Sequence, residues 1–198
     1  MAKNDIRLWN SPDGGHSLVR FGILNTGGET FVAGEPVRLE GTTGNLEECA
    51  SNPATGDDFG GIAVASGDTV GGTDANGAFR FKIGAFTPGS GLPVAGDLVP
   101  YIVPTPTTQF ITANLDTTTG AFGDTFTHAN SVSKGAGIQL TGGVWGIALG
   151  GNQIARVIDL LDVNYTPVGL SGLAAKFAVF VFTAAQNMAP TVNVDAAA

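Results

Sequence analysis

Thirty glycines in a chain of 198 residues restrict this protein to a fold with many tight turns. Glycine loses more backbone entropy on folding than any other residue, so a sequence retains it mainly where turns or close backbone approaches require it. The apolar residues lie in short pieces bounded by Gly, Asn, Asp or Pro, which are too short for helices and typical of strands. These pieces are 18–24, 30–32, 36–39, 61–65, 78–83, 98–103, 138–140 and 144–149. The sequence therefore predicts an all-β fold with little helix.

Four segments carry more specific expectations. Residues 79–83 alternate apolar with basic side chains, which predicts a strand with one buried face. Pro100 cannot donate a ladder hydrogen bond, so residues 98–103 are expected at a sheet edge or a bulge. Residues 154–163 fit a helical face or a strand, and the Gly-Gly-Asn turn before them favours a hairpin. Residues 113–137 are rich in Thr, Gly, Asn and Ser, which predicts a long exposed insertion.

The chain divides into an N-terminal arm (1–17), a β-rich domain (18–163) and a C-terminal extension (164–198) with one strongly apolar segment at 173–182. Alternation puts apolar side chains on both faces of this segment, so it has to be buried. Two alternatives remain open, a strand of the chain's own core and a strand between subunits. The candidates for subunit contact are Phe177, Val179, Phe180, Val181 and Phe182.

Charge and cysteine content exclude several classes of partner. The net charge of −8 gives no basic surface for nucleic acid or for an anionic membrane. No apolar stretch approaches the roughly 18 residues that a membrane span needs. Cys49 is the only cysteine and cannot form an internal disulfide, and the first residues lack the apolar core of a signal peptide. We therefore expect synthesis in a reducing cytoplasm.

The sequence shows no recognisable catalytic or metal-binding motif. HExxH, CxxC, the P-loop and GxSxG are all absent, and the two histidines, His16 and His128, lie far apart. The carboxylates are expected to be solvated charges that keep a glycine-rich sheet protein soluble rather than an acid/base pair. They include Glu47, Glu48, Asp57, Asp58, Asp97, Asp116, Asp124, Asp159 and Asp162. No catalytic residue, metal or cofactor is assigned.

Several short motifs follow one another in an order that resembles a known family. They are 34–37 (GEPV), 59–63 (FGGIA), 79–83 (FRFKI), 94–99 (VAGDLV), 145–149 (WGIAL) and 155–157 (ARV). Their order resembles the small capsid decoration, or cement, proteins of tailed bacteriophages, in particular the β-tulip type. Pro100, the long 113–137 segment and the part after Tyr165 depart from the family pattern.

The resemblance implies a small β-sandwich or partly open barrel that is not an enzyme and usually forms a homotrimer. Such a protein binds the outside of the expanded icosahedral head and clamps neighbouring major capsid protein subunits against the pressure of the DNA. The location implied is the capsid exterior of a virion, after synthesis in the cytoplasm of the bacterial host.

Within the N-terminal arm, Ile6, Leu8 and Trp9 are candidates for capsid contact, because Trp is a favoured interface residue. The alternative for Trp9 is packing on its own sheet. A rival function is a carbohydrate-binding head fibre or host-attachment module, with a glycan held by the 113–137 segment. Two Trp and two Tyr in the whole chain, none of them in that segment, weigh against the rival. A glycoside hydrolase is the third hypothesis.

Overall fold

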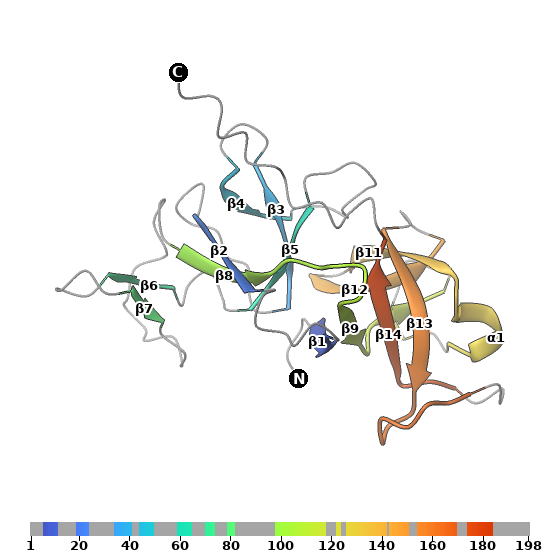
Figure 1. The fold of residues 1–198 in the computed structure, drawn as a ribbon. Helices are drawn as coiled ribbons and strands as arrows, with labels where there is room; N and C mark the ends of the chain where they lie inside the picture. The colour runs from blue at the N-terminus through green and yellow to red at the C-terminus, as the bar shows by residue number, and fades with distance from the viewer. Residues whose placement is uncertain are drawn as a thin grey trace.

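The computed structural model confirms the all-β class, with strands in two main sheets and one short helix (Figure 1). It describes residues 6–11, 19–23, 34–40, 44–49, 59–64, 70–73, 79–81, 98–117, 122–123, 126–141, 143–150, 154–169 and 174–183. The predicted strand at 30–32 and the sidedness expected for 79–83 lie outside what is described.

The larger sheet has seven strands. In spatial order they are β1 (Arg7–Asn10), β9 (Gln109–Thr112), β14 (Phe177–Phe182), β13 (Ala155–Leu161), β11 (Gly135–Thr141), β12 (Val144–Leu149) and β10 (Leu115–Asp116). All neighbours are antiparallel except β10 and β12, which run parallel. Strands from both predicted terminal segments, β1 and β14, are therefore built into this sheet, so neither is a free arm.

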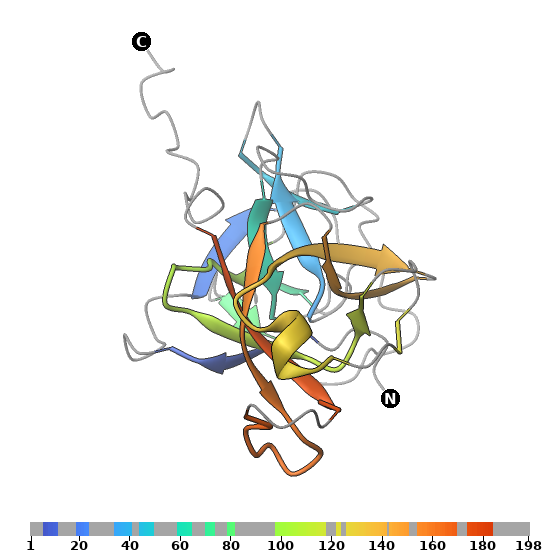
Figure 2. The same cartoon turned by 90° about the vertical axis from the view of Figure 1, so that its right-hand side faces the viewer.

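The smaller sheet has five antiparallel strands, in the order β2 (Val19–Ile23), β8 (Leu98–Ile102), β5 (Phe59–Ala63), β3 (Pro36–Leu39) and β4 (Leu46–Glu48). A separate pair, β6 (Val70–Thr73) and β7 (Phe79–Phe81), lies at the left in Figure 1. The helix α1 (His128–Ser131) is one turn long and faces the viewer in Figure 2.

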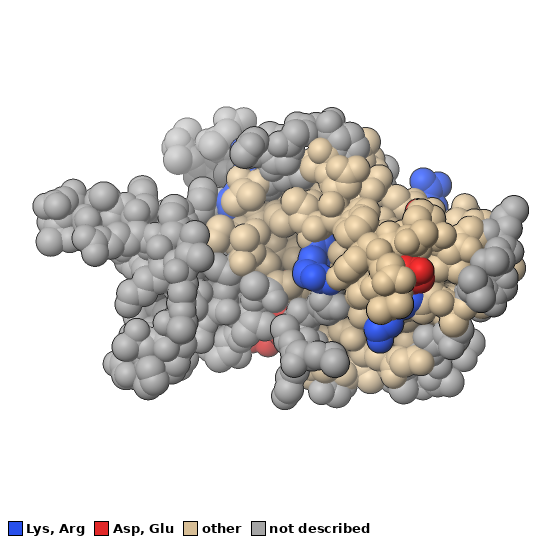
Figure 3. Space-filling model, turned by 90° about the horizontal axis from the view of Figure 1, so that it is seen from below, with Lys and Arg blue, Asp and Glu red and all other residues tan. Residues whose placement is uncertain are grey.

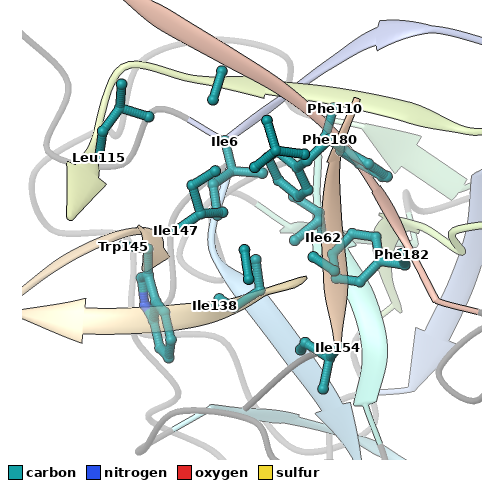
Figure 4. Close-up of a cluster of buried hydrophobic side chains, with 14 of the residues drawn as sticks. Ile6, Ile62, Phe110, Leu115, Ile138, Trp145, Ile147, Ile154, Phe180 and Phe182 are labelled. Atoms are coloured by element: carbon teal, nitrogen blue, oxygen red, sulfur yellow. The ribbon is translucent and has the colours of Figure 1, made fainter. Parts of the chain in front are cut away.

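The main hydrophobic core is shared by the two large sheets. Phe59, Ile62 and Ile102 of the smaller sheet lie in the same buried cluster as Phe110 and Phe180 of the larger one. Figure 4 shows many of these side chains converging between the strands. Burial of each large apolar side chain contributes about 1.5–3 kcal/mol. The shared core makes the two sheets a sandwich.

Strand β14 is a core strand of this chain. It pairs with β13 on one edge and with β9 on the other. Ala178, Phe180 and Phe182 join the main core, whereas Phe177 and Val179 join a second cluster on the opposite face, as the alternation predicts. The expectation of subunit contact is corrected for Val179, Phe180, Val181 and Phe182, because the chain itself buries all four.

The segment 113–137 is not the exposed insertion that its composition predicts. Its described part includes β10, α1 and the start of β11. Leu115, Phe126 and Ser131 are buried there, and Phe126 is fully enclosed in the main core. Phe126, an isolated aromatic residue of a Thr- and Gly-rich segment, is therefore a core residue, which excludes it as a glycan contact.

Two further expectations are corrected in part. Residues 155–161 form a strand, as favoured, but β13 pairs with β11 and β14 instead of forming a hairpin with β12. Pro100 lies in β8 between β2 and β5, not in an edge strand. The β5–β8 ladder reaches Tyr101, and beyond it the Val64 N–H donates to the Pro100 carbonyl, at 3.0 Å. Pro100 is accommodated because it contributes an acceptor at the end of that ladder.

Candidate functional site

The larger sheet carries a second apolar cluster on the face turned away from the main core. Ile111, Val179 and Leu161 are its buried members, and Ile158 and Phe177 pack against them as partly buried residues. Ile158 lies at a bulge in β13, where the register shifts between Val157 and Asp159. This face is therefore apolar at its centre although it is not covered by the smaller sheet.

An aromatic stack extends this cluster to the surface. The ring of Tyr165 stacks on Phe177 with centroids 4.7 Å apart and planes inclined by 10°. The ring of Trp9 stacks on Tyr165 at 5.7 Å and 18°. A ring has two faces, so Tyr165 lies between the other two. Trp9 is 42% exposed and Tyr165 44% exposed. The stack joins β1 to the turn after β13, two parts of the fold that are remote in sequence.

Hydrogen bonds stabilise the turn that contains Tyr165. One carboxylate oxygen of Asp162, Oδ1, accepts from the N–H groups of Asn164 (2.7 Å) and Thr166 (3.0 Å). The Asp162 N–H donates to the Thr166 carbonyl at 2.9 Å, and the Tyr165 N–H donates to the Asp162 carbonyl at 3.1 Å. These bonds close a compact turn around Tyr165.

Tyr165 has a left-handed backbone conformation, with φ of 61°. A residue with a Cβ atom loses about 1–2 kcal/mol in this conformation, and Asn or Gly occupies it more readily. The surrounding turn holds Tyr165 there despite that cost. Backbone strain of this kind is concentrated at functional positions, which marks the stack as the candidate site.

The three residues expected to contact a capsid are placed differently. Ile6 is 1% exposed and belongs to the main core, so the expectation for Ile6 is corrected. Leu8 and Trp9 are exposed, at 41% and 42%. Leu8 lies opposite Phe110, on the main-core side of the sheet, whereas Trp9 stacks on the other side. Trp9 is thus both packed on its own chain, over one ring face, and accessible.

The carboxylates described by the structure serve local roles. The Glu47 carboxylate in β4 forms a salt bridge with the Arg38 guanidinium in the neighbouring strand β3, at 2.7 Å. Asp159 Oδ1 accepts a hydrogen bond from the Leu160 N–H. Asp116 is buried, and its Oδ2 accepts from the Gln139 amide at 3.0 Å. Asp57, Asp58, Asp97, Asp124 and His16 lie outside the described residues.

Among the described residues, no three His, Cys, Asp or Glu side chains gather closely enough to hold a metal ion. Nor does that part of the chain contain a helix with the length and apolar character needed to cross a membrane.

Sequence reasoning singled out Trp9 and Phe177 but missed Tyr165, the residue between them. The available signal was the Asp-x-Asn-x-Thr spacing at 162–166, which is typical of a side-chain-capped turn. That pattern predicts the turn but not its neighbour, because contact with β1 depends on sheet order. Comparison with known proteins found no matching family model, no matching curated protein and no matching solved structure.

Proposed function

We propose that this chain is a non-enzymatic structural protein of a tailed-phage virion, which binds the outer surface of the expanded head and cements neighbouring major capsid protein subunits. The order of the sequence motifs supports this function, and so does the all-β sandwich scaffold. The place of action is then the capsid exterior, after synthesis in the host cytoplasm.

The observation that carries the proposal is the position of β1. This strand lies at the edge of the seven-stranded sheet, and all four of its residues are exposed. Within the described part of the chain, its only strand neighbour is β9. An edge strand that carries an exposed apolar side chain, here Leu8, can pair with a strand of another protein. Repetition of this contact over a symmetric lattice adds small free energies into high avidity.

The test uses expanded heads that lack this protein. We expect the purified chain to bind them and to raise the temperature at which they release DNA. Leu8→Asp should weaken binding, because a charge on the open edge opposes strand pairing. Val64→Asp, the same kind of change at another exposed apolar side chain, is the matched control and should bind normally. Failure of the unmodified chain to bind, or equal loss in both variants, overturns the proposal.

Self-association as a homotrimer is part of the proposal. Sedimentation equilibrium compares the mass in solution with the 20.0 kDa of one chain. A trimer supports a protein that sits at a symmetry axis of the lattice. If the chain is a monomer in solution and forms a trimer only on heads, the cement function stands and the preformed trimer is rejected.

A further inference from the structure

The outermost ring of the aromatic stack presents an open face. Tyr165 covers one face of the Trp9 ring, yet Trp9 remains 42% exposed. The one ring contact given for Trp9 is that with Tyr165, so we take the opposite face of the ring as the accessible one. At the other end, Phe177 is backed by the buried cluster of Ile111, Leu161 and Val179. The stack thus runs from the sheet to a flat apolar platform at the surface.

The platform is held in place before any ligand arrives. Trp9 belongs to a strand paired with β9, at a bulge between Leu8 and Asn10, and Tyr165 belongs to the turn closed by Asp162. A binding surface that is already ordered loses little conformational entropy when it is occupied. Asn or Gly at position 165 would relieve the backbone, but neither would provide the aromatic ring that stacks on Trp9.

The residues directly beside the two rings in the chain include neutral polar ones, and the charged Arg7 and Asp162 lie two and three residues before Trp9 and Tyr165. Asn10 follows Trp9, and Asn164 and Thr166 flank Tyr165, all of them exposed. Amide and hydroxyl groups both donate and accept hydrogen bonds. Figure 3 shows the molecule from below, the side where Figure 1 places β1 and the turn after β13, with charged residues scattered over a largely uncharged described surface. The ligand chemistry that fits is a flat apolar face edged by hydroxyl groups.

We infer that the open face of Trp9 is a binding site for a pyranose ring of a glycan, with hydrogen bonds from the polar groups beside the stack. A sugar ring has an apolar C–H face that matches an aromatic face and hydroxyl groups at its edge. A stable protein interface needs about 20–30 residues a side, far more than this small aromatic patch supplies. Sequence counts argued against glycan binding because Trp and Tyr are few, but the fold brings one of the two Trp and one of the two Tyr together.

Trp9 belongs to the same edge strand, β1, as the proposed head contact, but its ring stacks on the face of the sheet opposite to Leu8. The test uses the purified full chain and an immobilised array of bacterial lipopolysaccharides, capsular polysaccharides and peptidoglycan fragments. The glycan bound best is then titrated while tryptophan fluorescence is recorded. Trp145 is 2% exposed, so a change in emission on binding reports on Trp9, the only other tryptophan.

We expect saturable binding that Trp9→Ala weakens at least about tenfold, as for an interface Trp, and that Trp9→Phe partly retains. Tyr165→Asn tolerates the left-handed backbone and removes the supporting ring, so it should also weaken binding. Val163→Ala, at an exposed apolar side chain of the same turn, is the control and should change affinity less than about twofold. Thermal melting of each variant verifies its fold.

Two results overturn the inference. One is the absence of binding to every glycan on the array at millimolar concentration. The other is unchanged affinity in Trp9→Ala. If Trp9→Ala instead weakens attachment to heads while no glycan binds, the ring belongs to the head contact, and the glycan site is rejected while the cement function stands. If the chain binds a glycan but does not bind heads, the glycan site stands and the cement function is rejected.

Discussion

The ring of Phe59 in the five-stranded sheet stacks on the ring of Phe182 in the seven-stranded sheet, with centroids 4.8 Å apart. Phe182 also meets Phe110 edge to face at 5.2 Å. Both partners are buried, so Phe182 joins the two layers of the sandwich at the end of β14.

Phe182→Ala should therefore be strongly destabilising. Truncation of a fully buried Phe costs about 3–5 kcal/mol, because apolar contacts are lost and a cavity remains. Phe177→Ala on the same strand is the matched control, since Phe177 is only partly buried. Urea unfolding measures both changes. A loss for Phe182→Ala no larger than that for Phe177→Ala would contradict the assignment of Phe182 to the shared core.

Deletion of residues 173–198 tests the place of β14 as a whole. The deletion exposes the pairing edges of β9 and β13 and opens the main core. We expect an insoluble or unfolded product, as seen by sedimentation and circular dichroism. A folded, soluble monomer is the result expected of a strand shared between subunits, and it would reject the core assignment.

Two glycine substitutions separate steric overlap from backbone strain. Gly61 has φ of 151°, and an added Cβ atom would overlap the Ile102 carbonyl oxygen, whereas Gly143 has φ of 75° and open space around it. Gly61→Ala should lower the free energy of unfolding by about 2–4 kcal/mol, and Gly143→Ala by about 1 kcal/mol. Chemical denaturation provides both values, and equal losses would show that the β5–β8 contact is looser than the structure describes.

The buried hydroxyl of Tyr101 leads us to expect that the protein loses stability at alkaline pH. Burial raises the pKa of its hydroxyl above the ordinary 10.0, and the Arg20 guanidinium partly opposes this. As the pH rises past the unfolded pKa of 10.0, a larger fraction of Tyr101 is therefore ionised in the unfolded chain than in the folded one, which stabilises the unfolded state. The stabilising contribution is complete below the unfolded pKa and is lost as pH rises toward the folded pKa.

Tyr101→Phe keeps the ring and removes the titrating group, so its free energy of unfolding should fall less between pH 9 and 11 than that of the unmodified chain. Urea midpoints at several pH values measure the difference. Parallel declines in the two proteins would show that Tyr101 does not cause the loss.

The sequence predicted best what depends on neighbouring residues. The strands at 36–39 and 144–149 match short apolar pieces between turn residues, the piece expected at 61–65 overlaps the strand at 59–63, and the two apolar faces of β14 follow from alternation alone. The spatial order of the strands could not be predicted, because a local sequence pattern does not specify which edge of a sheet a strand joins. For this reason a β12–β13 hairpin was expected where β13 pairs with β11 and β14.

Only part of the candidate site could be predicted, because the sequence does not specify which strands are neighbours. Trp9 and Phe177 are conspicuous in the sequence, but their connection through Tyr165 requires β1, β9 and β14 to lie side by side. Ile6 was misassigned because an apolar residue near a terminus fits a core and an interface equally well until its burial is known. The segment 113–137 was misassigned because polar composition conceals single buried residues such as Phe126.

The position of β14 between β9 and β13 also determines when the protein can acquire its shape. Among the described strands, β14 is the last in the chain and joins the two halves of the larger sheet, so this sheet stays divided until the ribosome has released the chain as far as Phe182. Until then the sides of β9 and β13 that later meet β14 lack that partner, and unpaired strand edges favour association between nascent chains. Completion of the sheet thus waits for β14, and expression at low temperature or with chaperones that shield unpaired strands should favour it over aggregation.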